Sequence, residues 1–427
     1  MNKQASPKLG SFLELIGVVL LLIFSQEFVV PAPINTLFNI SSYGILILLV
    51  IGRWKHLAYA ATRDKSLLLL VVVAVISIFW SENVSYTADY AKGLIRTTLL
   101  GIFLGMRYTP KEQMRLLSWI FLLAIILSLF AGALMPAYGT HFINGVISWR
   151  GIYDHKQRLG RFMGFAASLL LMTLFDKHNN RWITLVGMVL SLVLLKLSNS
   201  TTGLIMLFFT LALLPIYKVA KQRNYRLFYL LLLLLFSGAL VISFLMNIES
   251  IFINILGKNL EFNGRTPIWS LVIEKGLERP ILGYGYYGFW GSEASDYVLN
   301  NTWLGDEKTG LENIIDTSSK KPVANISHNG FLDLFLNLGL VGLSLCLFNF
   351  FSLLHRITIL LLTIRNIEYF WMLVFVGITL ITNLSESMTF ITPNNLFWIT
   401  YVSIAVSSKI ELSRLQKTTI KYNTLAI

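Results

Sequence analysis

The stretch LLSWIFLLAIILSLFAGALM, residues 116–135, decides the fold class of this chain. It contains no charged side chain, and a helix of about 20 apolar residues is long enough to cross the hydrocarbon core of a bilayer. Inside a bilayer the backbone must satisfy its own hydrogen bonds, so such a run forms an α-helix. Similar apolar runs recur along the chain. They predict twelve spans, at residues 12–30, 37–51, 67–80, 94–106, 116–135, 160–175, 182–197, 203–217, 227–247, 331–352, 370–388 and 394–408.

The composition also favours an all-α integral membrane protein. Of the 427 residues, 55% are hydrophobic and only 13% are charged. We predict a single polytopic membrane domain over residues 1–427, with about 12 transmembrane helices. We interpret the formal net charge of +13 as loops that face anionic lipid, and we expect no nucleic-acid partner. The lone cysteine, Cys346, lies in an apolar run, which excludes an internal disulfide and favours a core position.

The distribution of basic residues predicts the orientation. The link 31–36 carries no charge, whereas the link 218–226 carries four lysines and arginines. Because basic residues gather in cytoplasmic loops, the second link is predicted to lie inside, with both termini cytoplasmic. The N-terminal run SFLELIGVVLLLIF is interpreted as a retained first helix, since no convincing cleavage pattern follows it. On this topology residues 248–330 form a large periplasmic loop that contains short helices.

A basic cluster lies on the predicted outer side, in RGIYDHKQRLGRFM, residues 150–163. An ionisable group held in the membrane costs at least about 2.5–3.5 kcal/mol unless it reaches water or is paired. Guanidinium groups bind phosphate oxygens in a bidentate fork, so the cluster indicates a phosphate-bearing ligand. The alternatives are arginines that reach up to the interface and, for Arg158, an i,i+4 pair with Asp154. The cluster consists of Arg150, His155, Lys156, Arg158 and Arg161.

The predicted periplasmic loop contains an amphipathic helix in GRTPIWSLVIEKGLERPILGYG, residues 264–285. Thr266 is its expected N-cap, Pro267 lies in its first turn, and Arg279-Pro280 ends it. The turn GYGYYG, residues 283–288, follows; the alternative of a phosphate loop there lacks the required lysine and hydroxyl residue. Residues 291–322 predict a polar lid, or alternatively a solvated loop without a role. The apolar side of the helix is Ile268, Leu271, Val272 and Leu277.

A histidine opens the tenth predicted span, in SHNGFLDLFLNLGLVGL, residues 327–343. Ser327 is the expected N-cap, which puts His328 in the first helical turn. There the helix dipole disfavours imidazolium, so a neutral imidazole that can act as a general base is expected. The alternative is a capping or interfacial histidine.

The sequence gives no support for a metal site. It contains no HExxH motif, no cysteine cluster and no DxD pair, and His155 and His328 are each alone in their segments. We therefore expect no metal and no cofactor.

Four stretches resemble the superfamily of O-antigen ligases and O-antigen or exopolysaccharide polymerases, which are bacterial membrane glycosyltransferases. The resemblance covers about residues 145–350 and departs from the family pattern at Gln157, where asparagine is usual. The stretches are RGIYDHKQRLGRFM, SNSTTGLIML, GRTPIWSLVIEKGLERPILGYG and SHNGFLDLFLNLGLVGL.

The resemblance implies a metal-independent, inverting transfer of a glycan from undecaprenyl pyrophosphate at the periplasmic face of the inner membrane. It implies that His328 activates the acceptor hydroxyl and that Arg150 and Arg265 bind the pyrophosphate. Lys156, Arg158 and Arg161 are supporting ligands, and Asn329 either orients His328 or binds sugar.

Two questions stay open at this stage. The acceptor is either lipid A-core, in lipopolysaccharide biosynthesis, or the end of another lipid-linked glycan, in O-antigen or exopolysaccharide polymerisation. The alternative from another class is a transporter or flippase of lipid-linked oligosaccharides, which would hold ionisable groups near the bilayer midplane in two related halves.

Overall fold

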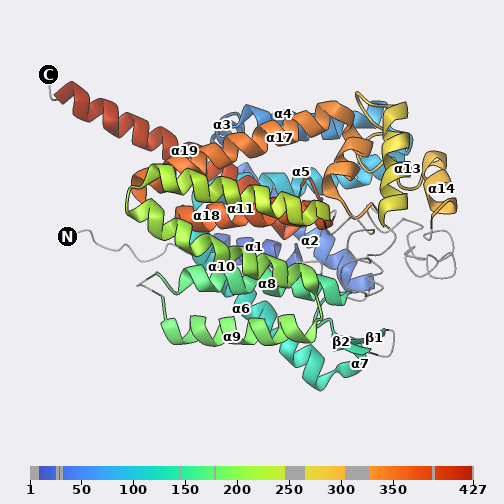
Figure 1. The fold of residues 1–427 in the computed structure, drawn as a ribbon, viewed down its shortest axis with the longest axis horizontal. Coiled ribbons are helices and arrows are strands. Elements are labelled where there is room, and N and C mark those ends of the chain that lie inside the picture. Colours follow the sequence, from blue (N-terminus) through green and yellow to red (C-terminus); the bar gives the residue numbers. More distant parts are fainter. Residues whose placement is uncertain are drawn as a thin grey trace.

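The computed structural model describes residues 9–25, 28, 32–143, 146–176, 179–245, 265–302, 327–386 and 390–425. Nearly all of them are helical. Most of the helices run roughly parallel to the long axis of the molecule, and one end of the bundle carries α13, α14, α7 and the β-hairpin (Figure 1). In order, the elements are α1 Leu9–Phe24, α2 Ala32–Ile51, α3 Trp54–Ala61, α4 Lys65–Ile76, η1 Ser77–Phe79, α5 Val84–Arg107, α6 Pro110–Leu134, α7 Pro136–Gly139, β1 Thr140–Ile143, β2 Val146–Trp149, α8 Lys156–Thr173, α9 Arg181–Leu197, α10 Thr201–Lys221, α11 Tyr225–Leu245, α13 Arg265–Glu278, α14 Glu293–Asn300, α17 Gly330–Ile364, α18 Ile367–Ser385 and α19 Leu396–Leu425.

The structure confirms the predicted helical class. Among the described residues, fewer helices than the twelve predicted spans are long and apolar enough to cross a membrane. Within the described residues each predicted span overlaps a helix. Four of these helices, α6, α10, α17 and α18, are long and apolar enough to span, or five if the bent pair of α2 and α3 forms one span. The count of twelve stays a prediction.

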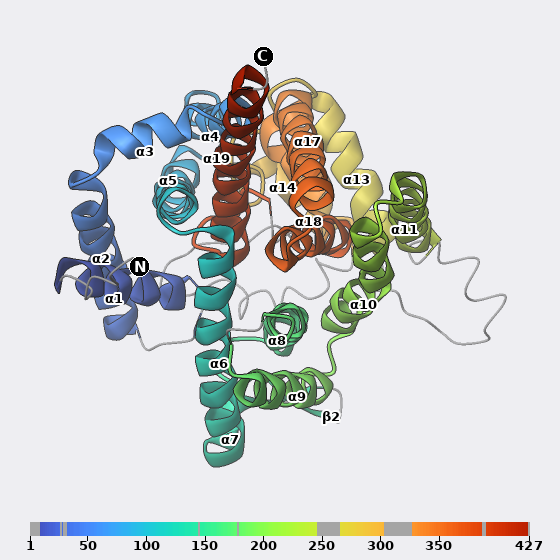
Figure 2. The same ribbon diagram turned by 90° about the vertical axis from the view of Figure 1, so that its left-hand side faces the viewer.

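Several of the remaining helices are too short or too polar to span by themselves. Helix α4 has 12 residues, and the first two turns of α8 contain Lys156, Arg158 and Arg161 of the basic cluster. Figure 2 shows why α8 tolerates polar residues, since α6, α9, α10 and α18 surround it. Apart from its first residues its side chains are almost all buried, so its composition reflects protein neighbours more than lipid.

The end of the bundle opposite α13 and α14 is held by ion pairs. Glu14 of α1 pairs at 2.7 Å with both Arg53 and Arg107. Asp64, the N-cap of α4, pairs with Arg356 of α17 at 2.6 Å, and both side chains are buried. These pairs lie at the end that the sequence predicts to be cytoplasmic.

Helix α13 confirms the predicted amphipathic helix with two corrections. It begins at Arg265, so Thr266 lies within it and is not the N-cap. Ile268 and Val272 are fully buried, whereas Leu277 is 64% exposed. The prediction for Leu277 was wrong because the helix packs against α17 and α14, and Leu277 does not lie on the side that these contacts bury.

The predicted turn at residues 283–288 is confirmed, and it is a packed connector. Gly283 and Gly285 have positive φ angles of 66° and 92°. The backbone N–H of Tyr286 donates to Ser77 Oγ at 2.8 Å, and that of Tyr284 donates to Leu336 O at 2.8 Å. The turn thereby joins η1 to α17. Of the predicted lid 291–322, α14 is described, while residues 303–326 lie outside the described residues.

Candidate functional site

The N-terminus of α17 is capped differently from the sequence prediction. The side chain of Asn329 accepts hydrogen bonds from the N–H groups of Phe331 and Leu332, at 3.0 and 3.2 Å. Asn329 is therefore the N-cap, and Ser327 is not. Serine and asparagine cap helices about equally well, so the sequence Ser-His-Asn could not decide between them.

His328 consequently lies outside the helix, just before the cap. The prediction that places it in the first helical turn was wrong. Its φ angle of 54° is in the left-handed region, a conformation that costs a non-glycine residue about 1–3 kcal/mol and is frequent at functional sites. The neighbouring carbonyl of Ser327 accepts a 2.7 Å hydrogen bond from Trp269 Nε1 of α13, which holds this backbone in place.

His328 faces a carboxylate that the sequence analysis missed. Oε2 of Glu386, the C-cap of α18, lies 3.8 Å from His328 Nδ1. The same oxygen lies 3.3 Å from Nη1 of Arg161 in the second turn of α8. Arg161 and Glu386 are only 5% and 7% exposed. The second turn of α8, the C-cap of α18 and the residue before the N-cap of α17 thus bring a cation, a carboxylate and an imidazole together.

A close helix contact makes this arrangement possible. At Gly330 an added Cβ would lie 2.2 Å from Oδ1 of Asn383 in α18. A larger residue would push the start of α17 away from the end of α18, and with it His328 away from Glu386. The sequence signal that could have identified Glu386 is its position inside the predicted span 370–388, where an ionisable residue points to function.

The start of α8 is capped by His155, whose Nδ1 accepts the N–H of Gln157 at 3.2 Å. Burial, and to a smaller extent the positive charges around it, lower the pKa of His155 to about 4. His155 is therefore neutral at pH 7 and adds no charge to the basic cluster. The centroid of its ring also lies 5.7 Å from that of His141. A second histidine is therefore close to His155 in the fold, although the two are in different sequence segments.

Arg150 directly follows β2 of the hairpin. Its Nε donates to Tyr138 O at 2.6 Å, and its Nη1 lies 2.7 Å from His141 Nε2 and 3.3 Å from Asp154 O. These contacts tie α7 and β1 to the segment that leads into α8. Within the described residues no hydrogen bond engages Nη2 of Arg150, so one edge of the guanidinium can meet a ligand.

The other predicted phosphate ligands differ in their surroundings. Arg158 pairs with Asp154 at 3.0 Å, as its i,i+4 spacing predicts. Lys156, half-buried at the start of α8, has no ion pair with another described residue. Arg265 is the first residue of α13, and its side chain lies outside what the structure describes.

The fold and this site together define a helical membrane protein with a cation, carboxylate and imidazole group at one end of the bundle. A family model described as O-antigen ligase matches residues 186–347. This match confirms the resemblance to the ligase and polymerase superfamily. The matched range includes Arg265 and His328, while the basic cluster precedes it. No curated protein matches the chain. Within the described residues, no three His, Cys, Asp or Glu side chains form a group that could hold a metal ion.

Proposed function

We propose that this protein is a glycosyltransferase that transfers or polymerises a glycan from undecaprenyl pyrophosphate at the periplasmic face of the bacterial inner membrane. The observation that carries the proposal is the meeting of Arg161, Glu386 and His328 at the end of the bundle that also holds the basic cluster. The match of residues 186–347 to the O-antigen ligase family model supports the same class of reaction.

In the proposed reaction His328 is the general base. It takes the proton of an acceptor hydroxyl, whose oxygen attacks the anomeric carbon of the donor sugar. The bond from that carbon to the pyrophosphate oxygen breaks, the pyrophosphate leaves with the bonding electrons, and the configuration at carbon inverts. A positioned base of this kind contributes about 10²- to 10⁴-fold to a rate.

Glu386 has a positioning role in this proposal. Its carboxylate faces Nδ1 of His328, so it orients the ring with Nε2 toward the acceptor and stabilises the imidazolium that forms. Arg161 holds Glu386 from the other side. We assign Arg161 mainly to the ion pair with Glu386. Its role as a ligand of the pyrophosphate is secondary.

The leaving pyrophosphate is stabilised by positive charge that is already in place. Arg150, Arg158, Lys156 and Arg265 are the proposed ligands. Arginine suits this role because it stays charged and binds phosphate through two parallel hydrogen bonds. Asn329 is assigned to capping α17, which holds His328 directly before the N-terminus of this helix.

Transfer in proteoliposomes tests the proposal. The purified protein is given defined glycans on undecaprenyl pyrophosphate, with either lipid A-core or a second lipid-linked glycan as acceptor, and with or without a metal chelator. We expect a new glycosidic bond, chelator-resistant, with one class of acceptor. A product on lipid A-core identifies a ligase and a longer lipid-linked chain identifies a polymerase. Movement of the donor across the bilayer without bond formation would contradict the proposal and support the transporter.

A further inference from the structure

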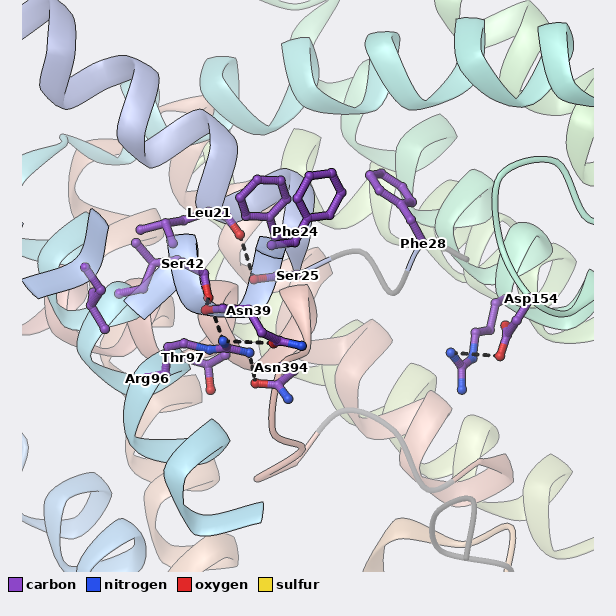
Figure 3. A pocket seen from close by; sticks show the side chains of 14 residues that line it. Leu21, Phe24, Ser25, Phe28, Asn39, Ser42, Arg96, Thr97, Asp154 and Asn394 are labelled. Carbon is purple, nitrogen blue, oxygen red and sulfur yellow. Dashed lines mark hydrogen bonds and ion pairs between the residues drawn. The ribbon is translucent and has the colours of Figure 1, made fainter. Parts of the chain in front are cut away.

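A second polar region lies beside the site, in a cavity of about 310 Å³ between α1, α2, α5 and the starts of α8 and α19. Figure 3 shows Arg96, Asn39, Ser42 and Asn394 gathered on one wall, with Asp154 at the far end. Arg158, the partner of Asp154, also lines the cavity. Two guanidinium groups therefore face one space of a size that is usual for small-ligand sites.

Arg96 is unusual because its partners are all neutral. Its Nη1 donates to Asn39 Oδ1 at 3.2 Å and to Ser42 Oγ at 2.6 Å, and its Nη2 donates to Asn394 Oδ1 at 2.6 Å. Its guanidinium also lies over the ring of Tyr43, 4.5 Å from the centroid. Among the described residues no carboxylate pairs with it.

Other arginines that enter the bundle are neutralised. Arg107, Arg115, Arg161 and Arg356 each pair with a carboxylate. Arg96, in contrast, lies within the predicted span 94–106 and is half-buried. An arginine at a membrane span that pairs with no carboxylate among the described residues favours an anion that arrives from outside the chain.

The rest of the lining indicates what carries that anion. Phe24 and Phe38 stack with ring centroids 4.5 Å apart, and Phe28 continues the aromatic side of the cavity. Figure 3 shows Phe24 near the polar wall and Phe28 on the side toward Asp154. A ligand that satisfies both sides has an anionic group for Arg96 and an apolar chain for the phenylalanines.

We propose that this cavity binds the phosphate group of an amphiphile, with Arg96 as its principal ligand and the phenylalanines against the first carbons of its chain. Asn39, Ser42 and Asn394 hold the guanidinium in position. The ligand is either a polyprenyl pyrophosphate or a membrane phospholipid, since both present a phosphate at the head of an apolar chain. The inference goes beyond the proposed transfer reaction, because it concerns binding by residues outside the Arg161–Glu386–His328 group.

Equilibrium binding to the full-length protein in a phosphate-free glycoside detergent tests it. The probes are geranylgeranyl pyrophosphate, phosphatidylglycerol, inorganic pyrophosphate and the neutral alcohol geranylgeraniol. We expect the pyrophosphate lipid to bind at least about tenfold more tightly than the alcohol, because hydrogen bonds to charged groups carry that much free energy. Binding of phosphatidylglycerol at similar strength identifies a general lipid-phosphate site, and its failure to bind identifies a site for the donor class.

The decisive variant is Arg96→Gln, which removes the charge and keeps a hydrogen-bonding side chain. It should weaken binding of the pyrophosphate lipid by about tenfold or more, while Arg96→Lys retains most of it. The matched control is Arg63→Gln, at an exposed arginine of the other end of the bundle. Should Arg96→Gln fail to fold, Asn39→Leu fills the cavity from an exposed position and is expected to weaken binding equally.

Three results would overturn the inference: unchanged binding in Arg96→Gln, equal binding of the alcohol, or equally tight binding of inorganic pyrophosphate alone. The assay contains no acceptor, so it is independent of catalysis. A protein that binds the probe through Arg96 but transfers no glycan would refute the proposed function and leave this site standing.

Discussion

His328 Nδ1 lies 3.8 Å from Oε2 of Glu386, across the junction between the start of α17 and the end of α18. That separation is longer than a hydrogen bond. Catalytic contacts of this kind often tighten only when substrate is bound. Because Arg161 holds the same oxygen from α8, the carboxylate is fixed, and a small movement of the imidazole completes the contact.

Replacing Glu386 by glutamine should lower the rate of transfer at least about tenfold, because the variant loses the charge that stabilises the imidazolium. The affinity for donor should change little, since Glu386 faces His328 and Arg161. Steady-state kinetics over a range of pH separate the two effects. Glu368→Gln, at the other end of α18, is the matched control. A pH profile and rate equal to those of the parent would remove Glu386 from the mechanism.

His328→Ala should retain donor binding and lose turnover by about 10²-fold or more. Single-turnover transfer and direct donor binding are the two measurements. His56→Ala is the control, because His56 is exposed on α3 at the opposite end of the bundle. An unchanged rate in His328→Ala would exclude it as the base.

Arg150→Ala and Arg265→Ala should each abolish transfer in proteoliposomes while the protein stays inserted and folded. For Arg150 we also expect a modest loss of stability, since the side chain ties the hairpin to the approach to α8. Size-exclusion profiles and thermal unfolding separate this loss from the loss of transfer. Near-normal transfer in both variants would refute their role as pyrophosphate ligands.

Asp64→Asn should destabilise the protein by about 3–5 kcal/mol, because it leaves Arg356 charged and buried without its partner. The pair is 2.6 Å apart, and both side chains are nearly inaccessible. Denaturant unfolding in detergent measures the change. The double variant Asp64→Leu/Arg356→Met should recover much of the loss, since it removes both charges together. Equal stability of Asp64→Asn and the parent would show that the ion pair contributes nothing.

The stability of the fold should fall as the pH decreases from about 6.5 to about 4. The pKa of His155 is lowered to about 4 in the folded state, so in this window the unfolded chain binds a proton that the folded chain rejects. Above about pH 6.5 the stability that His155 contributes in its neutral form is fully present. His155→Asn, which keeps a good N-cap, should unfold with a smaller pH dependence than the parent. An identical dependence would show that His155 does not titrate in this way.

The sequence by itself determined the helical class, the residues of most helices, the amphipathic helix α13 and the turn at residues 283–288. It did so because apolar periodicity, glycine and proline act on neighbouring residues, and the signals are local. The same locality explains the errors. Ser327 and Asn329 are both good caps, and the choice between them is made together with contacts to distant elements, such as the hydrogen bond from Trp269 Nε1 to Ser327 O.

Only the tertiary structure decided the composition of the site. Glu386 is 58 residues from His328 and 225 from Arg161 in sequence, and no local pattern relates them. The same holds for Arg96, whose neutral partners come from α2 and from the segment before α19. Whether a charged side chain is neutralised, held for catalysis or left for a ligand depends on which distant helices pack beside it, and that information arises when the bundle assembles.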